Sequence, residues 1–334
     1  DHFMGADETE VVSAVSYQFD DRTQPSSGKE EIEAWTKFTF PGRQGKYNDY
    51  QWNWKNFSGV DYDAREKDHA IFNFANKGWA PKVDDENGNF DYLMGCNLDM
   101  ENPDTIEQLD KWGKWYQELT DVDGYRLDAV KHIRFDLFVD WLLHRREEKG
   151  EELFVVGEYW SDELDKLQEY LDSSGNLISL FDVPLHFNLF QAASTMGGFD
   201  MRQIFAGTLI ETRPDWAVTF VDNHDTQLGQ SLESWIEGWF KLHAYSLILL
   251  RNEGTPVVFW GDLYGTEKAE AVGSGLTNLI ELREELNFGN QADYFDDPDV
   301  IGWTLTGDFD DSDSGAAIIM TNAKGGEKEM TVSA

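Results

Sequence analysis

The sequence predicts an α/β fold: about five strand–helix units of a (β/α)8 TIM barrel, with a β-rich segment before them and the start of a β-sandwich domain after them. Short apolar runs alternate with helical patterns between residues 102 and 290, as in a parallel sheet covered on both faces. Polar residues gather where each run ends, and the active sites of α/β barrels lie at the carboxyl ends of their strands. A doubly wound sheet is the alternative, although no Gly-rich phosphate loop follows a strand.

The expected elements follow in order from Asn102, a suitable N-cap for a helix with Pro103 in its first turn. Apolar residues keep helical spacing from there to residue 119, and Gly150 ends the second helix. The expected barrel strands are 122–130, 153–160, 177–183, 217–226 and 255–262, and the helices after them are 136–149, 162–171, 200–206, 233–251 and 275–286.

The residues before and after this region have a different pattern. Up to about residue 100, turn residues recur, aromatic residues are dense and no long helical period is present, which favours short strands and loops. Residues 299–307 and 314–322 again have the pattern of strands. We therefore expect three domains, over residues 1–101, 102–290 and 291–334. Five units do not close an eight-fold barrel, so we expect about three units before Asp1 and further β structure beyond the last residue.

The charge of the chain limits its partners. Its 334 residues include 64 acidic and 27 basic side chains, for a net charge of -37, which disfavours nucleic acid or an anionic membrane as a partner. No apolar run is long enough for a transmembrane helix. The acidic residues are spread along the chain. This distribution is typical of a well-solvated surface, of adaptation to high salt or of affinity for divalent cations. A single cysteine, Cys96, allows no intrachain disulfide and disfavours a thiolate zinc site.

The stretch VDGYRLDAVKHI (122–133) places charged groups at the end of an apolar strand. Arg126 and Asp128 alternate with apolar residues and therefore share one face of the strand. Charged groups are costly to bury unless they pair or take part in chemistry. From this stretch alone, a structural ion pair and a functional site both remain open.

Three carboxylates, Asp128, Glu158 and Asp225, end three different predicted strands, with aromatic or His neighbours. Metal-dependent hydrolysis and glycoside hydrolysis by paired carboxylates both use such a set. A glycosidase needs one ionised and one protonated acid. Arg126 stabilises an ionised Asp128, whereas the apolar run before Glu158 favours a protonated carboxyl. These patterns leave the two reaction types open.

Several separated segments carry a resemblance to a known family. DGYRLDAVKH, GEYW and FVDNHD look like three conserved segments of the α-amylase family, glycoside hydrolase family 13, and Asp1-His2 matches the end of a fourth, which ends in Asn-His in the family. MGADE (4–8), NGNFDYLMG (87–95), FDVPLHF (181–187) and DLYGT (262–266) extend the match over nearly the whole chain. The chain is most similar to the bacterial liquefying type and its cytoplasmic relatives.

The resemblance implies a role for each matched residue. Asp128 matches the nucleophile, Glu158 the general acid/base and Asp225 the third acid, while Arg126 orients Asp128. The positions that match contacts to the sugar are His2, Lys131, His132, Trp160 and His224. The implied mechanism retains the anomeric configuration, so the carboxyl groups of Asp128 and Glu158 are expected to lie about 5–5.5 Å apart.

The resemblance also implies a calcium site. Residues 1–101 match the B domain, an insertion after the third barrel strand. The ligand positions for Ca²⁺ match Asp1, Asp91, Asn97 and the carbonyl oxygen of His132, and calcium prefers oxygen ligands of this kind. Asp1 stands in place of Asn and Asn97 in place of Asp, changes of opposite charge. A polar cluster without metal is the alternative.

Two further metal sites of the family have weaker matches. In a calcium–sodium cluster, Ser58 and Ala80 stand at two carboxylate positions, while Asp99 and Glu101 remain, so that cluster is not expected here. A third site would use Gly197, Asp299 and Asn322.

The expected function is that of an α-amylase, which hydrolyses α-1,4 bonds within glucans. The expected partner is an α-glucan, and the expected state is a monomer. A related transglycosylase, an α-1,6-glucosidase and a non-catalytic α-glucan-binding protein are the alternatives. DDRTQ (20–24) and FSGVD (57–61) resemble the cytoplasmic branch of the family, with secretion as the alternative.

Overall fold

The computed structural model describes residues 1–285, 289–308 and 314–332. The chain divides into two compact units. The first contains residues 1–158 and 173–177, and the second contains residues 159–172 and 178–334. This division follows packing within the chain, and the domain boundaries expected from the sequence, at residues 101 and 290, stay a prediction.

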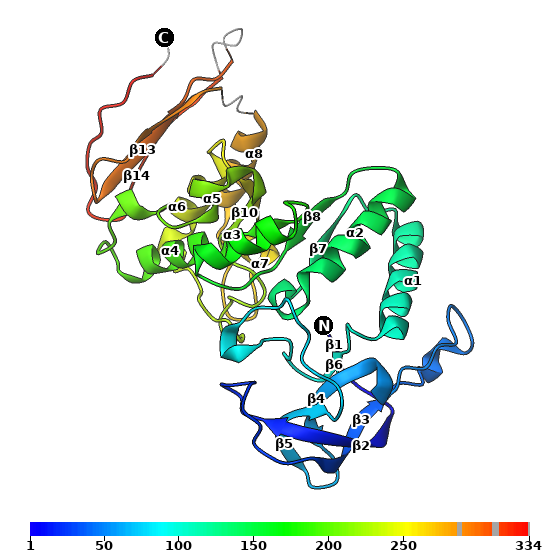
Figure 1. The fold of residues 1–334 in the computed structure, drawn as a ribbon. Helices are drawn as coiled ribbons and strands as arrows, with labels where there is room; N and C mark the ends of the chain where they lie inside the picture. The colour runs from blue at the N-terminus through cyan, green and yellow to red at the C-terminus, as the bar shows by residue number, and fades with distance from the viewer. Residues whose placement is uncertain (286–288, 309–313, 333–334) are drawn as a thin grey trace. The chain divides into compact units, whose positions relative to one another are not determined.

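An antiparallel six-stranded sheet fills the start of the first unit (Figure 1), in the order β1-β6-β4-β5-β2-β3. In β2, Val12, Ala14 and Ser16 are buried while Val11 is exposed, the period of two that a one-sided sheet requires. Phe57 and Phe74 are fully buried in the core beneath it. The strands are β1 (His2–Phe3), β2 (Glu8–Tyr17), β3 (Glu30–Lys37), β4 (Phe57–Asp63), β5 (Asp68–Phe74) and β6 (Cys96–Leu98), with 3-10 turns at Pro41–Arg43, Trp54–Asn56 and Glu86–Gly88.

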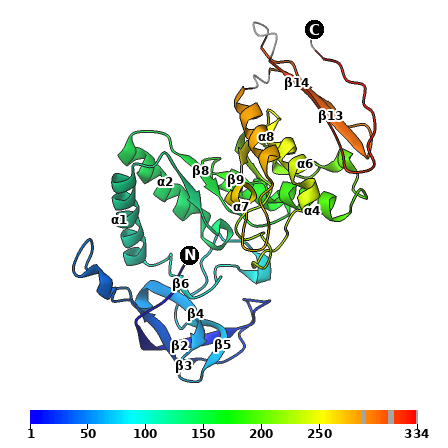
Figure 2. The ribbon, with the colours of Figure 1, turned by 180° about the vertical axis from the view of Figure 1, so that it is seen from behind.

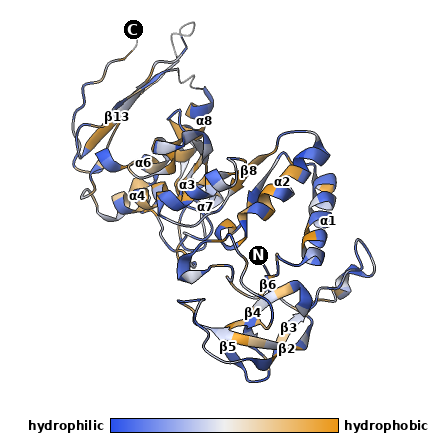
Figure 3. Ribbon diagram, in the orientation of Figure 1, coloured by the Kyte–Doolittle hydropathy of each residue, from blue (hydrophilic) through white to orange (hydrophobic). Residues whose placement is uncertain are grey.

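The rest of the first unit begins the strand–helix pattern. β7 (Gly124–Leu127) pairs in parallel with β8 (Phe154–Gly157). Helices α1 (Pro103–Thr120) and α2 (Phe135–Lys149) lie side by side, and Figure 3 shows hydrophobic residues of α1 among mainly hydrophilic ones. The helices approach closely at Gly113, where a Cβ would lie 2.6 Å from the indole nitrogen of Trp141.

The second unit continues the pattern with β9 (Ser179–Phe181), β10 (Ala217–Phe220) and β11 (Thr255–Val257), which pair in parallel. Figure 2 shows α6 and α8 of this unit side by side. Its helices are α3 (Leu164–Ser173), α4 (Val183–Ser194), α5 (Leu209–Thr212), α6 (Gly238–Leu249), α7 (Trp260–Tyr264) and α8 (Ser274–Glu285), with 3-10 turns at Met201–Gln203 and Pro214–Trp216.

An antiparallel sheet follows in the described part of residues 291–332, formed by β12 (Gln291–Tyr294), β13 (Val300–Leu305) and β14 (Ala316–Thr321). Every residue of β13 is buried. The indole nitrogen of Trp303 donates a hydrogen bond to the carbonyl oxygen of Leu250 at 2.6 Å, so this strand packs on the end of α6.

Most expected elements are confirmed, one expected helix is wrong and another begins later than expected. All five barrel strands occur within their expected ranges, each shorter than expected. The helix expected at 200–206 is only the 3-10 turn Met201–Gln203. The helix expected at 233–251 begins at Gly238, because the backbone of Ser234 and Ile236 is bonded to Thr226 and Asp222 instead. The final residue of the helix expected at 275–286 lies outside the described residues. Within the described ranges, no helix combines the length and apolarity that crossing a membrane requires.

Candidate active site

Arg126 joins two of the three predicted carboxylates. It lies on β7, and its Nη1 donates to Oδ1 of Asp128 while its Nη2 lies 3.5 Å from Oε2 of Glu158. The side chain of Asp128 is 65% exposed and that of Glu158 only 10%. The structure therefore places an accessible carboxylate and a buried one on the same guanidinium group.

The backbone after Asp128 turns sharply toward Glu158. Ala129 has a φ of 51°, a left-handed conformation that costs an alanine roughly 1–2 kcal/mol. In this conformation its N–H donates to Oε2 of Glu158 at 3.1 Å. Val130 donates to the carbonyl oxygen of Glu158, and Glu158 donates to that of Leu127. The ends of β7 and β8 are thus bonded together at the two acids.

Lys131 and His132 follow in a 3-10 turn, Val130–His132, and contact the loop before β6. Lys131 Nζ donates to Glu86 at 2.8 Å and lies 4.9 Å from the centre of the Phe90 ring. The Nδ1 of His132 shares a hydrogen bond with the carbonyl oxygen of Phe90 at 2.8 Å. Burial lowers the pKa of His132 to about 4. Both side chains are therefore bonded within the first unit, and their predicted contact with sugar stays a prediction.

His2 lies on the short N-terminal strand β1. Its Nδ1 is 2.6 Å from Oδ1 of Asp1, and β1 places it opposite Asn97 of β6. The N-terminal strand thus joins a predicted sugar contact to predicted calcium ligands.

Asp225, His224 and Trp160 belong to the second unit. The N–H of Asp225 donates to Oδ1 of Asn223 at 2.8 Å, and Nε2 of His224 lies 3.2 Å from Oδ2 of Asp225. Trp160 packs with its ring centre 6.0 Å from that of Phe187. Each predicted residue after β10 is therefore held by its neighbours in the same loop.

A family model described as "Alpha amylase, catalytic domain" matches residues 30–298 of the chain. The chain belongs to the α-amylase family. An "Alpha-amylase" of Geobacillus stearothermophilus is 47% identical over 99% of this chain and 61% of its own length. A "Cytoplasmic alpha-amylase" of Escherichia coli (strain K12) is 44% identical over 98% of this chain and 69% of its own length. The chain thus spans roughly two thirds of these relatives.

The solved structure of an α-amylase from Geobacillus thermoleovorans, complexed with acarbose, has the same fold. It superposes with a TM-score of 0.53 at 22% identity, over 70% of this chain and 56% of that chain. Together with the family match, this confirms part of an α-amylase barrel with associated antiparallel sheets.

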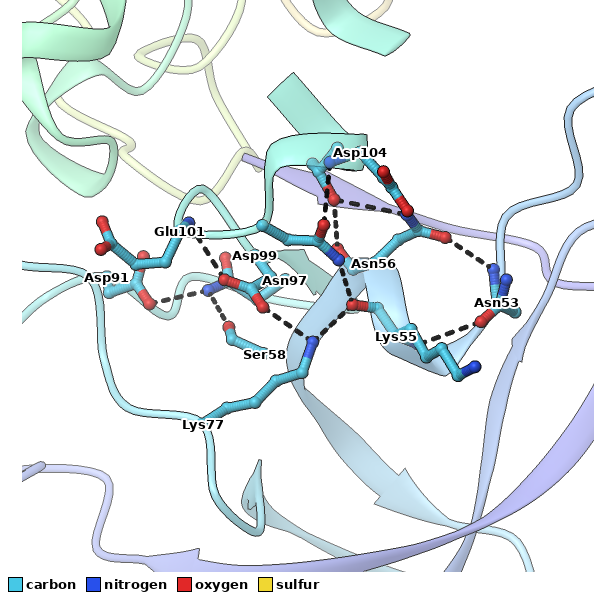
Figure 4. Close-up of polar contacts among 12 residues, drawn as sticks. Asn53, Lys55, Asn56, Ser58, Lys77, Asp91, Asn97, Asp99, Glu101 and Asp104 are labelled. Atoms are coloured by element: carbon cyan, nitrogen blue, oxygen red, sulfur yellow. Dashed lines mark hydrogen bonds and ion pairs between the residues drawn. The ribbon is translucent and has the colours of Figure 1, made fainter. Parts of the chain in front are cut away.

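Three of the predicted calcium ligands of this α-amylase family member, Asp1, Asp91 and Asn97, lie in a buried oxygen-rich group in the first unit. The side-chain amide of Asn97 donates to Oδ2 of Asp91 at 3.0 Å and to Oγ of Ser58 at 2.8 Å, and Figure 4 shows both contacts. Leu98 donates to the carbonyl oxygen of Asp1, and Oδ2 of Asp1 is buried without a hydrogen-bond partner. Burial raises the pKa of Asp91 to about 6, although hydrogen bonds from Ala80 and Asn97 favour its ionised form.

This group fits a hard cation in its chemistry. Two buried carboxylates and an amide oxygen suit calcium, and the unpartnered oxygen of Asp1 is a free acceptor. The set has only two acidic side chains. Consistently, the described part of the chain contains no group of three or more His, Cys, Asp or Glu side chains arranged to hold a metal ion.

An ammonium group contacts one of the remaining acidic residues of the calcium–sodium cluster, in which Ser58 and Ala80 stand at two carboxylate positions. Lys77 Nζ donates to Oδ2 of Asp99 at 2.7 Å and to the carbonyl oxygen of Lys55 at 2.6 Å (Figure 4). Glu101 contacts Arg134 instead. The remaining acids of this cluster are therefore paired with side-chain cations.

Sequence reasoning missed a buried ion network in the second unit. Lys241 lies between Asp222 and Asp262, and all three are at most 1% exposed. A signal was present, since Lys241 interrupts an apolar helix and Asp222 precedes Asp225 by three residues. The pairing itself depends on tertiary contacts between α6, α7 and the loop after β10.

Proposed function

We propose that the protein is an α-amylase that hydrolyses internal α-1,4-glucosidic bonds of starch- or glycogen-type glucans with retention of configuration. The observation that carries this proposal is the contact of Arg126 with both Asp128 and Glu158 in a member of the α-amylase family. Retaining glycosidases use such a carboxylate pair.

The proposed reaction has two steps. Asp128 attacks the anomeric carbon and forms a covalent glycosyl–enzyme bond, while Glu158 gives its proton to the departing glycosidic oxygen. Glu158 then takes a proton from water, whose oxygen attacks the anomeric carbon and releases Asp128. The exposure of Asp128 and its contact with Arg126 suit an ionised nucleophile.

The remaining residues are proposed to bind substrate. Asp225 would bind sugar hydroxyl groups and stabilise the distorted, oxocarbenium-like ring. The other proposed sugar contacts are His2, Lys131, His132, Trp160 and His224. The exposed imidazole of His224 beside Asp225 supports a hydroxyl-binding role for this pair.

We also propose that Asp1, Asp91, Asn97 and the carbonyl oxygen of His132 hold Ca²⁺. The unpartnered oxygen of Asp1 and the buried Asp91 support this assignment. A bound ion would supply positive charge that stabilises the loop between β5 and β6 and the turn after Asp128. Calorimetric titration of the EDTA-treated protein with CaCl₂ tests the site: we expect heat of binding that is lost in Asp91→Asn. A titration without binding heat would contradict it.

Hydrolysis of starch tests the activity. We expect reducing ends to appear with a rapid loss of iodine staining, the sign of internal cleavage, and Glu158→Gln to abolish both. Glu163→Gln, an exposed position five residues later, is the matched control and should keep wild-type activity. If Glu158→Gln kept the wild-type rate, the assignment of the acid/base would be wrong.

Product analysis separates the alternatives. An α-1,6-glucosidase would hydrolyse the α-1,6 bonds of pullulan and release maltotriose. A transglycosylase would yield longer or cyclic glucans from short acceptors. Binding of starch without new reducing ends would indicate a glycan-binding protein. We propose a monomer, which light scattering after gel filtration tests.

A further inference from the structure

A lysine is fully buried in the second unit, close to the loop that carries Asp225. Lys241 lies on α6 and is 1% exposed. Its Nζ donates to Oδ2 of Asp222 and, at 2.7 Å, to Oδ1 of Asp262, and it lies 3.3 Å from the centre of the Trp235 ring. An ammonium group in such a place is costly to desolvate unless its partners are fixed.

Asp222 connects this lysine to both ends of the loop 222–236. Its Oδ1 accepts a hydrogen bond from Oγ1 of Thr226 at 2.7 Å. Its Oδ2 also accepts from the backbone N–H of Ile236 at 3.3 Å. The carboxylate held by Lys241 therefore fixes the start and the end of the loop.

The turn that contains Asp225 is bonded to Thr226, the residue whose hydroxyl group donates to the carboxylate of Asp222. Thr226 Oγ1 accepts from the N–H of Asn223, and Oδ1 of Asn223 accepts from the N–H groups of Asp225 and Thr226. Leu232 donates to the carbonyl oxygen of Asp225. A continuous series of hydrogen bonds thus runs from Lys241 through Asp222 and Thr226 to the backbone of Asp225.

We propose that Lys241 is a positioning residue: it fixes Asp222, and Asp222 fixes the turn that holds the carboxylate of Asp225 in place for substrate. The kinetic part of this inference rests on the proposed function. A purely structural lysine would stabilise the unit without a specific effect on Asp225, and the experiment separates these roles.

The first measurement is hydrogen–deuterium exchange of peptides that cover residues 222–236, which needs no activity. In Lys241→Met we expect faster exchange in this loop, because Asp222 loses the cation that fixes it. Arg251→Met is the matched control. Arg251 is another buried cation of the same unit, with two hydrogen bonds of 2.8 Å to Asp293, and its loss should leave exchange of the loop unchanged. Unchanged exchange in Lys241→Met would overturn the proposal.

The second measurement is steady-state hydrolysis of starch. We expect Lys241→Met to lower kcat/KM about tenfold or more in the otherwise wild-type protein. In a protein that already carries Asp225→Asn, we expect the same substitution to lower kcat/KM by less than a further factor of about two, because effects that act through one residue are not additive. A full additional loss in the Asp225→Asn background would contradict action through Asp225. Arg251→Met should lower stability and keep the kcat/KM of the folded protein.

Thr226→Val provides a second variant in case Lys241→Met does not fold. It removes the hydroxyl group that joins Asp222 to the turn and keeps the buried ion network. Faster exchange of the loop and lower kcat/KM would support the proposal, and wild-type values for both would overturn it. A wild-type protein without hydrolytic activity would reject the proposed function, whereas the exchange result stands independently of it.

Discussion

The backbone N–H of Ala129 donates to the carboxylate of Glu158 at 3.1 Å. This bond exists because Ala129 takes a left-handed conformation directly after Asp128. The conformation thus joins the proposed nucleophile to the proposed acid/base through one residue. Strained backbone of this kind is retained where the surrounding structure holds it in place.

Substitution at Ala129 is expected to follow this conformation. Ala129→Val puts a β-branched side chain at a positive φ and should lower the free energy of unfolding by about 2 kcal/mol and reduce activity. Ala129→Gly relieves the strain and should keep the stability near the wild-type value. Urea denaturation with parallel starch assays checks both. Equal stability of the Val and Gly variants would show that the turn does not require this conformation.

Arg126 is expected to need its planar, forked shape as well as its charge. It contacts Asp128 with Nη1 and approaches Glu158 with Nη2, and lysine cannot reach two carboxylates in this way. We expect Arg126→Lys to lower kcat about a hundredfold with a smaller change in KM, because the loss falls on the reacting groups. Lys149→Arg, a cation elsewhere in the first unit, is the control. Near-normal kcat in Arg126→Lys would reduce the role of Arg126 to charge alone.

His186 makes the stability of the second unit depend on pH. Burial lowers its pKa to about 4 from an ordinary value of 6.5, and its Nδ1 shares a hydrogen bond of 2.7 Å with the carbonyl oxygen of Val221. The folded state thus favours neutral His186, so this contribution to stability is complete above pH 6.5 and is lost as the pH falls toward 4. The loss amounts to about 3 kcal/mol.

The test compares unfolding of the wild type and of His186→Gln between pH 7 and pH 4. The wild type should be more stable at pH 7, and the difference should shrink as the pH falls. His144→Gln, at an exposed imidazole, should keep the wild-type dependence. A difference between wild type and His186→Gln that is constant with pH would contradict the expectation.

Local signals predicted the parts of the fold that depend on neighbouring residues. The Asn102 cap, whose side chain accepts from the N–H of Asp104, and the left-handed Gly150 were both readable. The rule that barrel active sites lie at the carboxyl ends of the strands also predicted where the acidic residues lie. The sequence predicts a helix from residue 233, but the carboxylate of Asp222 accepts a hydrogen bond from the backbone N–H of Ile236, and α6 begins only at Gly238. The Ala129 turn and the Lys241 network likewise depend on long-range pairing, which the local pattern does not contain.

Lys77 is expected to stabilise the first unit without a metal ion. Its ion pair with Asp99 is largely buried on both sides, and removing one partner leaves the other charge without compensation. We expect Lys77→Met to lower the free energy of unfolding by about 1–3 kcal/mol. Lys111→Met, which breaks an exposed pair within α1, should cost about 0.5 kcal/mol or less. Equal effects of the two substitutions in urea denaturation would contradict the difference in burial.

Salt is expected to stabilise the protein because of its net charge of -37. Repulsion among dispersed carboxylates disfavours the compact state, and salt screens it, with a Debye length that falls from about 30 Å at 0.01 M to about 10 Å at 0.1 M. We expect Tm to rise steeply with NaCl in this range and to level off as screening is completed. KCl should act equally, since screening depends on ionic strength and not on the cation. A Tm that is constant with NaCl, or that rises with NaCl alone, would show that general repulsion among the surface carboxylates is not the cause.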